Sequence, residues 1–279
     1  MPVPVPVPVP LPLSLPVPVT VPMPVTLPVS LPMSAPLPCI PRYPPRMHAP
    51  SADHVNIAYE TTGTGDTALV FVHGWLGNKR WWDAQRDAFA ATHTVVQLDL
   101  AGHGDSGGNR STWSVQAYAA DIQAVAAQLT ASRIVLVGHS MSGAHVVEAS
   151  LGIDRTAAII LVDTLKDLDQ VTPPAQIEQM LGLYRNDYRA TVENILPQFL
   201  FSSQTSAAVR AQLTAEFLHA EGSRAAQLLE PLYRYDPRLA APRITVPVRA
   251  INGDLHPTNL AVSRTYFRDF DATIIPGVG

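Results

Sequence analysis

The chain has 279 residues, a formal net charge of −4 at neutral pH and a hydrophobic fraction of 47%. Its only lysines are Lys79 and Lys166, so the sequence offers no basic stripe for nucleic acid, and we expect no nucleic-acid partner. Cys39 is the single cysteine, which excludes an intrachain disulfide framework and a cysteine-based metal site. No metal-ligand cluster, phosphate loop or nucleotide-binding fingerprint is recognisable, so no metal and no cofactor are expected.

Residues 1–45 consist mainly of Val-Pro, Leu-Pro and Met-Pro repeats and contain most of the 27 prolines. Proline at every second position excludes an α-helix, so this apolar stretch predicts neither a membrane span nor a signal-peptide helix. We interpret residues 1–50 as a disordered, extended tail, either dispensable or used as a stiff spacer or groove ligand. On this basis no membrane span is expected, and a cytoplasmic location is favoured.

The pattern after the tail predicts alternating strands and helices. Residues 55–60 alternate as an edge strand would, and the turn at 62–66 predicts that a hairpin opens the domain. Further strands are predicted at 68–72, 94–99, 134–137 and 157–162, and helices at 81–91 and, behind a Ser114 cap, at 115–129. Such alternation predicts an α/β domain with a parallel sheet and helices on both faces.

Strand signals disappear between residues 166 and 240, where apolar residues recur at helical spacing. This segment predicts a helical lid over the carboxyl edge of the sheet, where open α/β folds bind ligands. The alternative is that these helices simply cover the core. On the lid interpretation, the core comprises two parts, residues 51–165 and residues 241–279. The second part contains the strands predicted at 246–251 and 272–275.

Ser140 is the first candidate for a nucleophile. The apolar strand at 134–137 runs into Gly-His-Ser-Met-Ser-Gly at 138–143, and small, helix-compatible residues follow. A strand, a tight turn and a helix lift a hydroxyl above the carboxyl edge of a sheet, with a helix N-terminus behind it. The alternative is that Ser140 merely caps the helix.

Several motifs together resemble the α/β-hydrolase family over residues 52–279. They are Val-His-Gly-Trp at 72–75, Asp-Leu-Ala-Gly-His-Gly-Asp-Ser at 99–106, the turn at 138–143, Val-Pro-Val at 246–248 and the final Pro-Gly-Val-Gly. The resemblance implies the α/β-hydrolase fold, a mostly parallel sheet flanked by helices with a helical lid insertion.

The resemblance also implies a serine hydrolase that forms an acyl-enzyme at Ser140 on an ester, lactone, thioester or similar bond. The backbone N–H groups of Trp75 and Met141 would form the oxyanion hole. His73 and His139 would lie beside the substrate, although such histidines more often hold loops by hydrogen bonds. The turn departs from the family pattern Gly-x-Ser-x-Gly, because Ser142 takes the second glycine position; serine is small enough to be tolerated there.

Two aspartates are candidates for the acid that orients a catalytic histidine. In the family it most often lies three residues after the glycine of a late strand, and here that position holds His256. Asp163, at the end of the strand after the nucleophile helix, takes the position that other members use, and we favour it. Asp254 is the alternative acid. Without a catalytic role, Asp254 would form a turn and Asp163 would cap a helix.

The base is the open question. In the resembling family the catalytic histidine follows the final Gly-x-Gly turn and would be residue 280. We therefore interpret the chain as truncated just before this histidine, with an apolar strip of the sheet exposed where a closing helix normally packs. His256 is a substitute base only if its loop lies beside Ser140.

Two functions follow for the whole protein. The first is hydrolysis of a small-molecule acyl substrate, small or medium and apolar, given Trp75, Trp81 and Trp82. The second is a non-catalytic binding protein that keeps the hydrolase pocket. The sequence leaves the oligomeric state open.

Overall fold

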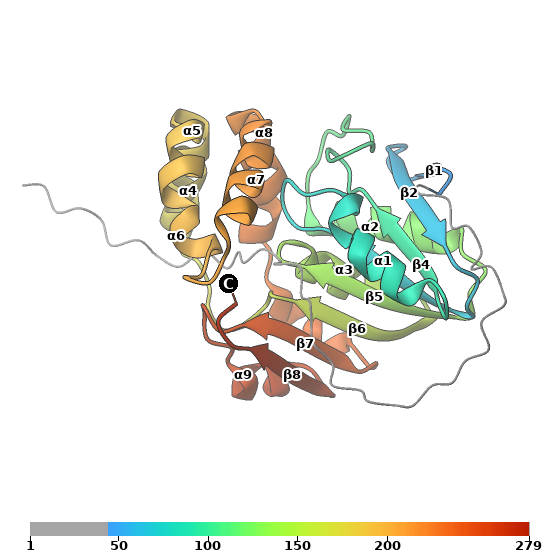
Figure 1. The fold of residues 1–279 in the computed structure, drawn as a ribbon. Helices are drawn as coiled ribbons and strands as arrows, with labels where there is room; N and C mark the ends of the chain where they lie inside the picture. Colours follow the sequence, from blue (N-terminus) through green and yellow to red (C-terminus); the bar gives the residue numbers. More distant parts are fainter. Residues whose placement is uncertain (1–43, 279) are drawn as a thin grey trace, which may run out of the picture.

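The computed structural model describes residues 44–278 (Figure 1). The predicted tail therefore lies, up to residue 43, outside the described residues. Its last four residues do not belong to a tail, because β1 (Met47–Pro50) pairs antiparallel with β2 (Asn56–Thr62). The folded part thus begins at or before Met47.

The core is one sheet of eight strands in the order β1-β2-β4-β3-β5-β6-β7-β8. From β4 to β8 all neighbouring strands are parallel, whereas β1 and β2 run antiparallel to their neighbours. The other strands are β3 (Thr67–Val72), β4 (Thr94–Leu98), β5 (Arg133–His139), β6 (Thr156–Val162), β7 (Val248–Gly253) and β8 (Phe270–Ile275). The predicted α/β class and mostly parallel sheet are confirmed.

The prediction that the strand at 55–60 forms a hairpin with the next strand of the chain is wrong. β2 does not pair with β3, the next strand in the chain; it lies between β1 and β4, with Tyr59 opposite Leu98. The turn at residues 62–66 therefore leads across the sheet. β1, which the sequence pattern assigned to the tail, takes the edge position that was predicted for residues 55–60.

Helices cover both faces of the sheet because the central strands are apolar on both sides. On β3, Val70 and Val72 join the larger core cluster, which includes residues of α2 (Val115–Ala127) and α3 (Ser142–Ser150). Phe71, between them, joins a smaller cluster with Trp82. Trp82 ends the 3-10 helix η1 (Lys79–Trp82), and α1 (Asp83–Phe89) follows directly. As predicted, Ser114 caps α2, its Oγ accepting the N–H of Ala117 at 3.0 Å.

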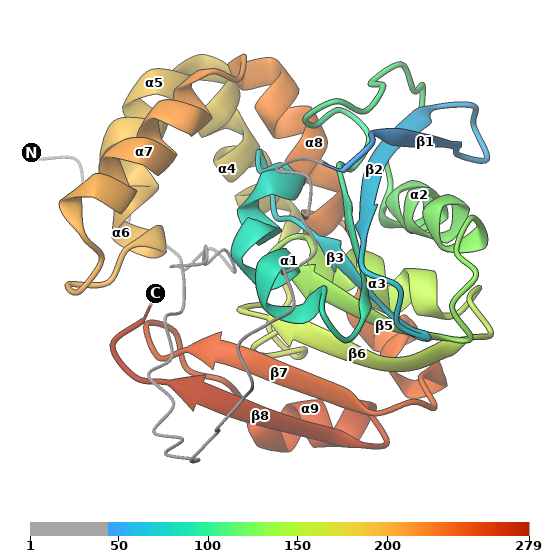
Figure 2. The same cartoon turned by 45° about the vertical axis from the view of Figure 1, so that its right-hand side comes forward.

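The helices that follow β6, up to residue 233, gather on the side toward which the parallel strands point (Figure 2). We call the part of the chain from residue 174 to residue 243 the helical segment. It comprises α4 (Pro174–Asn186), α5 (Tyr188–Ala190), the π-helix η2 (Thr191–Ile195), α6 (Pro197–Leu200), α7 (Ala207–Leu218), α8 (Gly222–Tyr233), η3 (Pro237–Leu239) and η4 (Ala241–Arg243). Its position over the carboxyl edge is the one that the lid hypothesis requires.

The far end of the sheet carries α9 (Leu260–Tyr266) between β7 and β8. On the face that carries α1, Ile160 and Val162 are only partly buried, and Ile251, opposite Val162 in register, is 39% exposed. Among residues 44–278 no helix has both the length and the apolar character needed to cross a membrane.

Candidate active site

Ser140 lies at a strained turn between β5 and α3. Its φ is +52°, a left-handed conformation that costs a non-glycine residue about 1 kcal/mol or more. Two hydrogen bonds to the neighbouring strand hold it, from its N–H to the carbonyl of Val162 at 3.0 Å and from Thr164 Oγ1 to its own carbonyl at 2.6 Å. The side chain is buried, and among the described residues its Oγ has no hydrogen-bond partner. A hydroxyl held in this way is available for chemistry.

The small residues around this turn are required by close packing. A Cβ at Gly138 would lie 2.5 Å from the carbonyl oxygen of Ser142, and one at Gly143 would lie 2.3 Å from Thr164 Cγ2. The tight position after the serine is therefore Gly143. Residue 142 can carry a side chain, and the Ser142 hydroxyl donates to the backbone carbonyl of His73. This explains the departure from the family pattern.

The loop after β3 lies directly against the turn. A Cβ at Gly74 would lie 3.2 Å from Ser140 Cβ. His73 Nδ1 donates to the carbonyl of Gly74 at 2.7 Å, and its Nε2 accepts the N–H of Leu100 at 3.1 Å, which fixes one neutral tautomer. Burial lowers the pKa of His73, although Asp99 acts against this effect. Both ring nitrogens thus hold loops, and a contact of His73 with substrate remains a prediction.

The two predicted oxyanion donors flank this junction. Trp75 follows Gly74, where the loop passes close to the turn, and Met141 follows Ser140; both Trp75 and Met141 are buried. The Trp75 side chain points into the helical segment, where its indole N–H donates to the carbonyl of Ala225 at 2.9 Å. His139 is also buried, with its ring centre 6.1 Å from that of Trp81. The roles assigned to Trp75, Met141 and His139 remain predictions.

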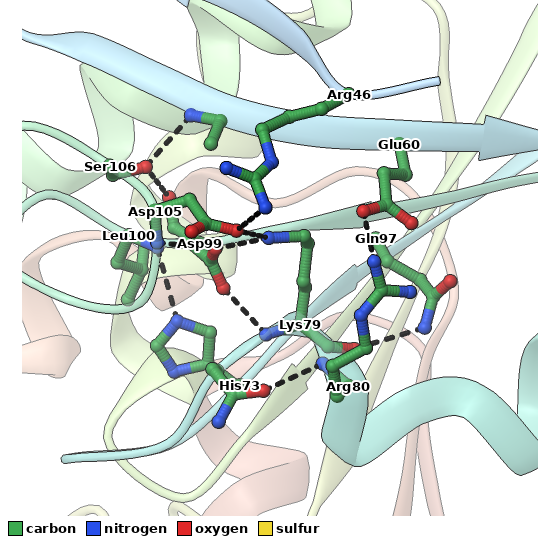
Figure 3. Close-up of polar contacts among 12 residues, drawn as sticks. Arg46, Glu60, His73, Lys79, Arg80, Gln97, Asp99, Leu100, Asp105 and Ser106 are labelled. Carbon is green, nitrogen blue, oxygen red and sulfur yellow. Dashed lines mark hydrogen bonds and ion pairs between the residues drawn. The ribbon is translucent and has the colours of Figure 1, made fainter. Parts of the chain in front are cut away.

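Figure 3 shows a buried ion pair beneath this loop. The sequence alone does not indicate it. Lys79 Nζ lies 2.6 Å from Asp99 Oδ2 and 2.6 Å from Asp105 Oδ2, and the Lys79 backbone N–H donates to Asp99 Oδ1. Burial raises the pKa of Asp99, but His73, the Asp105 amide and Lys79 outweigh this effect and hold the pKa below its usual value. The network fixes the loops after β3 and β4 to one another. Asp99 is part of a recognised motif, but its pairing with Lys79 requires the folded chain.

Strand register places Asp163 beside Ser140. His139 lies opposite Val162, so the residues that follow them, Ser140 and Asp163, leave adjacent strands at the same edge. Asp163 Oδ1 accepts the N–H of Gly253 at 2.9 Å and contacts Lys166 Nζ at 2.7 Å.

The second carboxylate oxygen of Asp163, Oδ2, is buried and has no hydrogen-bond partner among the described residues. Burial raises the pKa of Asp163, and Lys166, the Gly253 amide and His256 partly offset that rise. A buried carboxylate with one free oxygen next to a serine fits the predicted acid. The assignment itself remains a proposal.

The alternative acid and the alternative base have other partners. Asp254 Oδ1 accepts the N–H of Gly277 at 2.8 Å, so this carboxylate holds the turn after β8. His256 Nε2 lies 3.2 Å from the carbonyl oxygen of Phe199 in the helical segment, and it is not hydrogen-bonded to Ser140. The structure thus brings Asp163 to Ser140 and places Asp254 and His256 in contacts of their own.

A hollow of about 340 Å³ separates α1 and η1 from α7. Trp81 lines it and donates its indole N–H to Glu216 Oε2 at 3.1 Å. Of the three tryptophans expected near the substrate, Trp75 is buried against the helical segment and Trp82 mainly in the core under α1. Within residues 44–278 no group of three or more His, Cys, Asp or Glu side chains could hold a metal ion.

A sequence model of the Alpha/beta hydrolase family matches residues 69–279. Since this match covers most of the chain, the chain belongs to the α/β-hydrolase family. Among solved structures, an esterase from Exiguobacterium antarcticum superposes with a TM-score of 0.72, covering 82% of this chain and 90% of that chain at 18% identity. At this identity the likeness concerns the fold alone.

Curated relatives match shorter stretches. Over 121 residues the chain is 32% identical to a non-heme haloperoxidase of Rhodococcus erythropolis, covering 42% of this chain and 44% of that protein. Over 105 residues it is 34% identical to the dihydrolipoyllysine-residue acetyltransferase component of the acetoin cleaving system of Pseudomonas putida, covering 37% of this chain and 28% of that protein. The chain thus spans less than half the length of either relative.

Proposed function

We propose that the protein is a serine hydrolase that cleaves an ester or related acyl bond through an acyl-enzyme at Ser140. The observation that carries the proposal is the state of Ser140: strained at a φ of +52°, buried, and with a hydroxyl that has no partner among the described residues. Membership of the α/β-hydrolase family supports a hydrolase function.

The reaction follows from the chemistry of the residues around Ser140. Ser140 Oγ attacks the acyl carbon while a base takes its proton, and the negative oxygen of the tetrahedral intermediate accepts the N–H groups of Trp75 and Met141. The intermediate collapses, the alcohol leaves with the proton, and water then releases the acid from Ser140 by the same steps. Asp163 orients the protonated base and stabilises its charge.

The turn that holds Gly277 is linked to the candidate site through Asp254 and Gly253. The Gly277 amide is bound by Asp254 and its carbonyl accepts the Ser202 hydroxyl at 2.8 Å, so this turn is fixed to both the core and the helical segment. Asp254 follows Gly253, whose amide binds Asp163.

The test uses the full-length protein as its gene encodes it. A fluorophosphonate probe should label Ser140, and p-nitrophenyl butyrate should be hydrolysed. Ser140→Ala should abolish both signals. The matched control is Ser150→Ala at the other end of α3, whose hydroxyl donates to the Val147 carbonyl; it should leave both signals intact.

A wild-type protein that neither takes the probe nor hydrolyses the ester would contradict the proposal. Ligand-induced thermal stabilisation that survives Ser140→Ala would then favour the alternative, a binding protein that keeps the pocket without catalysis.

A further inference from the structure

We propose that Trp75 is a positioning residue through which the helical segment fixes the oxyanion donor. We call residues 73–78 the oxyanion loop. The Trp75 backbone N–H is one of the donors in the proposed mechanism, and the Trp75 side chain is the part of this loop that the helices hold. The inference rests on the proposed function and deepens it.

On the core side, the start of the oxyanion loop is fixed to the turn at Ser140. The His73 ring bridges the Gly74 carbonyl and the Leu100 amide, and the His73 carbonyl accepts the Ser142 hydroxyl. A Cβ at Gly74 would lie 3.2 Å from Ser140 Cβ, so the loop passes close to the turn at this point. These bonds fix the residues that precede Trp75, but none of them is made by Trp75 itself.

On the other side, the indole of Trp75 is enclosed by three helices of the helical segment. Its Nε1–H donates to the Ala225 carbonyl of α8 at 2.9 Å. Its ring packs against Tyr184 of α4 with centroids 5.1 Å apart and against Phe217 of α7 at 5.7 Å. The side chain is only 2% exposed. Trp75 therefore joins the core loop to the helices over the sheet edge.

The direction of the Trp75 backbone N–H depends on this anchor. A buried side chain in a fixed rotamer restricts the backbone that carries it, and the residue after it, Leu76, has a left-handed φ of +57° that gives the loop a tight course. A hydrogen bond weakens steeply as its angle falls, and an oxyanion donor acts only if it is already aimed. Loss of the anchor should therefore affect the transition state more than substrate binding.

The deciding variant is Trp75→Phe in the full gene product, because it keeps an aromatic ring and removes only the indole N–H and some ring area. For p-nitrophenyl butyrate we expect kcat to fall about tenfold or more, with KM within about twofold of wild type. Amide hydrogen exchange at residues 74–76 should become faster. Thermal unfolding of the variant is measured as well, to verify that the assay temperature lies below its unfolding transition.

The matched control is Trp113→Phe. The indole N–H of Trp113, which precedes α2, has no hydrogen-bond partner among the described residues, so its removal breaks no bond of this kind. This variant should keep kcat and the exchange of residues 74–76 at wild-type values.

An active wild type whose Trp75→Phe variant keeps kcat within twofold, or exchanges residues 74–76 at the wild-type rate, overturns this inference alone. A proportional rise of KM with unchanged kcat also overturns it, since that result indicates a substrate contact. An inert wild type overturns the proposed function and this inference with it.

Discussion

At the scale of single residues, the two candidate acids have different partners, and this separates their expected roles. Asp163 leaves β6 beside Ser140 and keeps one buried carboxylate oxygen without a partner among the described residues, whereas Asp254 binds the Gly277 amide. Since a histidine needs a carboxylate that is buried and has an acceptor to offer, Asp163 is the better candidate.

Asp163→Asn is therefore expected to lower kcat for p-nitrophenyl butyrate by about two orders of magnitude or more, because an amide neither stabilises imidazolium nor fixes its tautomer. Asp254→Asn should have a much smaller effect, since the amide oxygen can still accept the Gly277 N–H. Steady-state kinetics of both variants decide the assignment. The opposite order of the two losses would make Asp254 the acid.

The sequence could nominate candidate residues where a pattern is local, and their catalytic roles remain predictions. Ser140 follows from a strand, a turn and a helix in consecutive residues, and Asp163 from its place at the end of a strand. The hydrogen bond from Ser142 to the His73 carbonyl and the burial of Trp75 against Tyr184 join residues far apart in the chain. No local pattern encodes such contacts, so the sequence could not predict them.

At the scale of elements, the loops after β3 and β4 are joined by a buried ion pair. Lys79 and Asp99 are 2% and 0% exposed, and they meet at 2.6 Å. Removing one partner of such a pair leaves the other charge buried, which is far more costly than losing a surface pair.

Lys79→Met should thus lower the free energy of unfolding by about 3–5 kcal/mol, measured by urea denaturation. The control is Arg189→Ala, which removes an exposed pair with Glu193 on the helical segment and should cost under about 0.5 kcal/mol. A loss below about 1 kcal/mol for Lys79→Met would show that water or another cation replaces the lysine.

The order of the first strands shows why element identity was easier to predict than element pairing. β2 was recognised from its alternation, and its partner was misassigned because the turn at 62–66 looks like a hairpin turn. The pairing of β2 with β4 joins residues more than thirty positions apart, as Tyr59 with Leu98. Loop closure of that length leaves no mark in the local sequence. β1 was missed for a different reason: its pairing with β2 is local, but the strand has only four residues and ends at Pro50, next to the proline-rich segment.

At the scale of the whole molecule, the core contains a group of buried histidines, His73, His103 and His145. The rings of His73 and His103 lie 5.0 Å apart, and His145 stacks on Tyr118 at 4.5 Å. Burial, followed by the neighbouring histidines, lowers the pKa of His103 and of His145 to about 3, and burial lowers the pKa of His73 as well. All three are therefore neutral in the folded protein near neutral pH.

This group should make the fold sensitive to mild acid. In the unfolded chain a histidine takes up a proton below a pKa of about 6.5, whereas the folded protein holds His103 and His145 neutral down to about pH 3. The unfolded state binds more protons in this window, so stability falls as the pH falls, by up to about 1.4 kcal/mol per pH unit for each histidine. The raised pKa values of Asp121 and Asp163 act in the opposite direction, since these carboxyls favour protonation in the folded state.

Urea denaturation at pH 7, 6 and 5 should therefore give a free energy of unfolding that decreases at each step. His145→Phe keeps a ring against Tyr118 and removes one titrating group. It should therefore reduce the slope of the unfolding free energy against pH by the amount that one histidine contributes. A stability that stays level or rises between pH 7 and pH 5 would mean that the buried carboxyls, not the histidines, govern the acid response of the core.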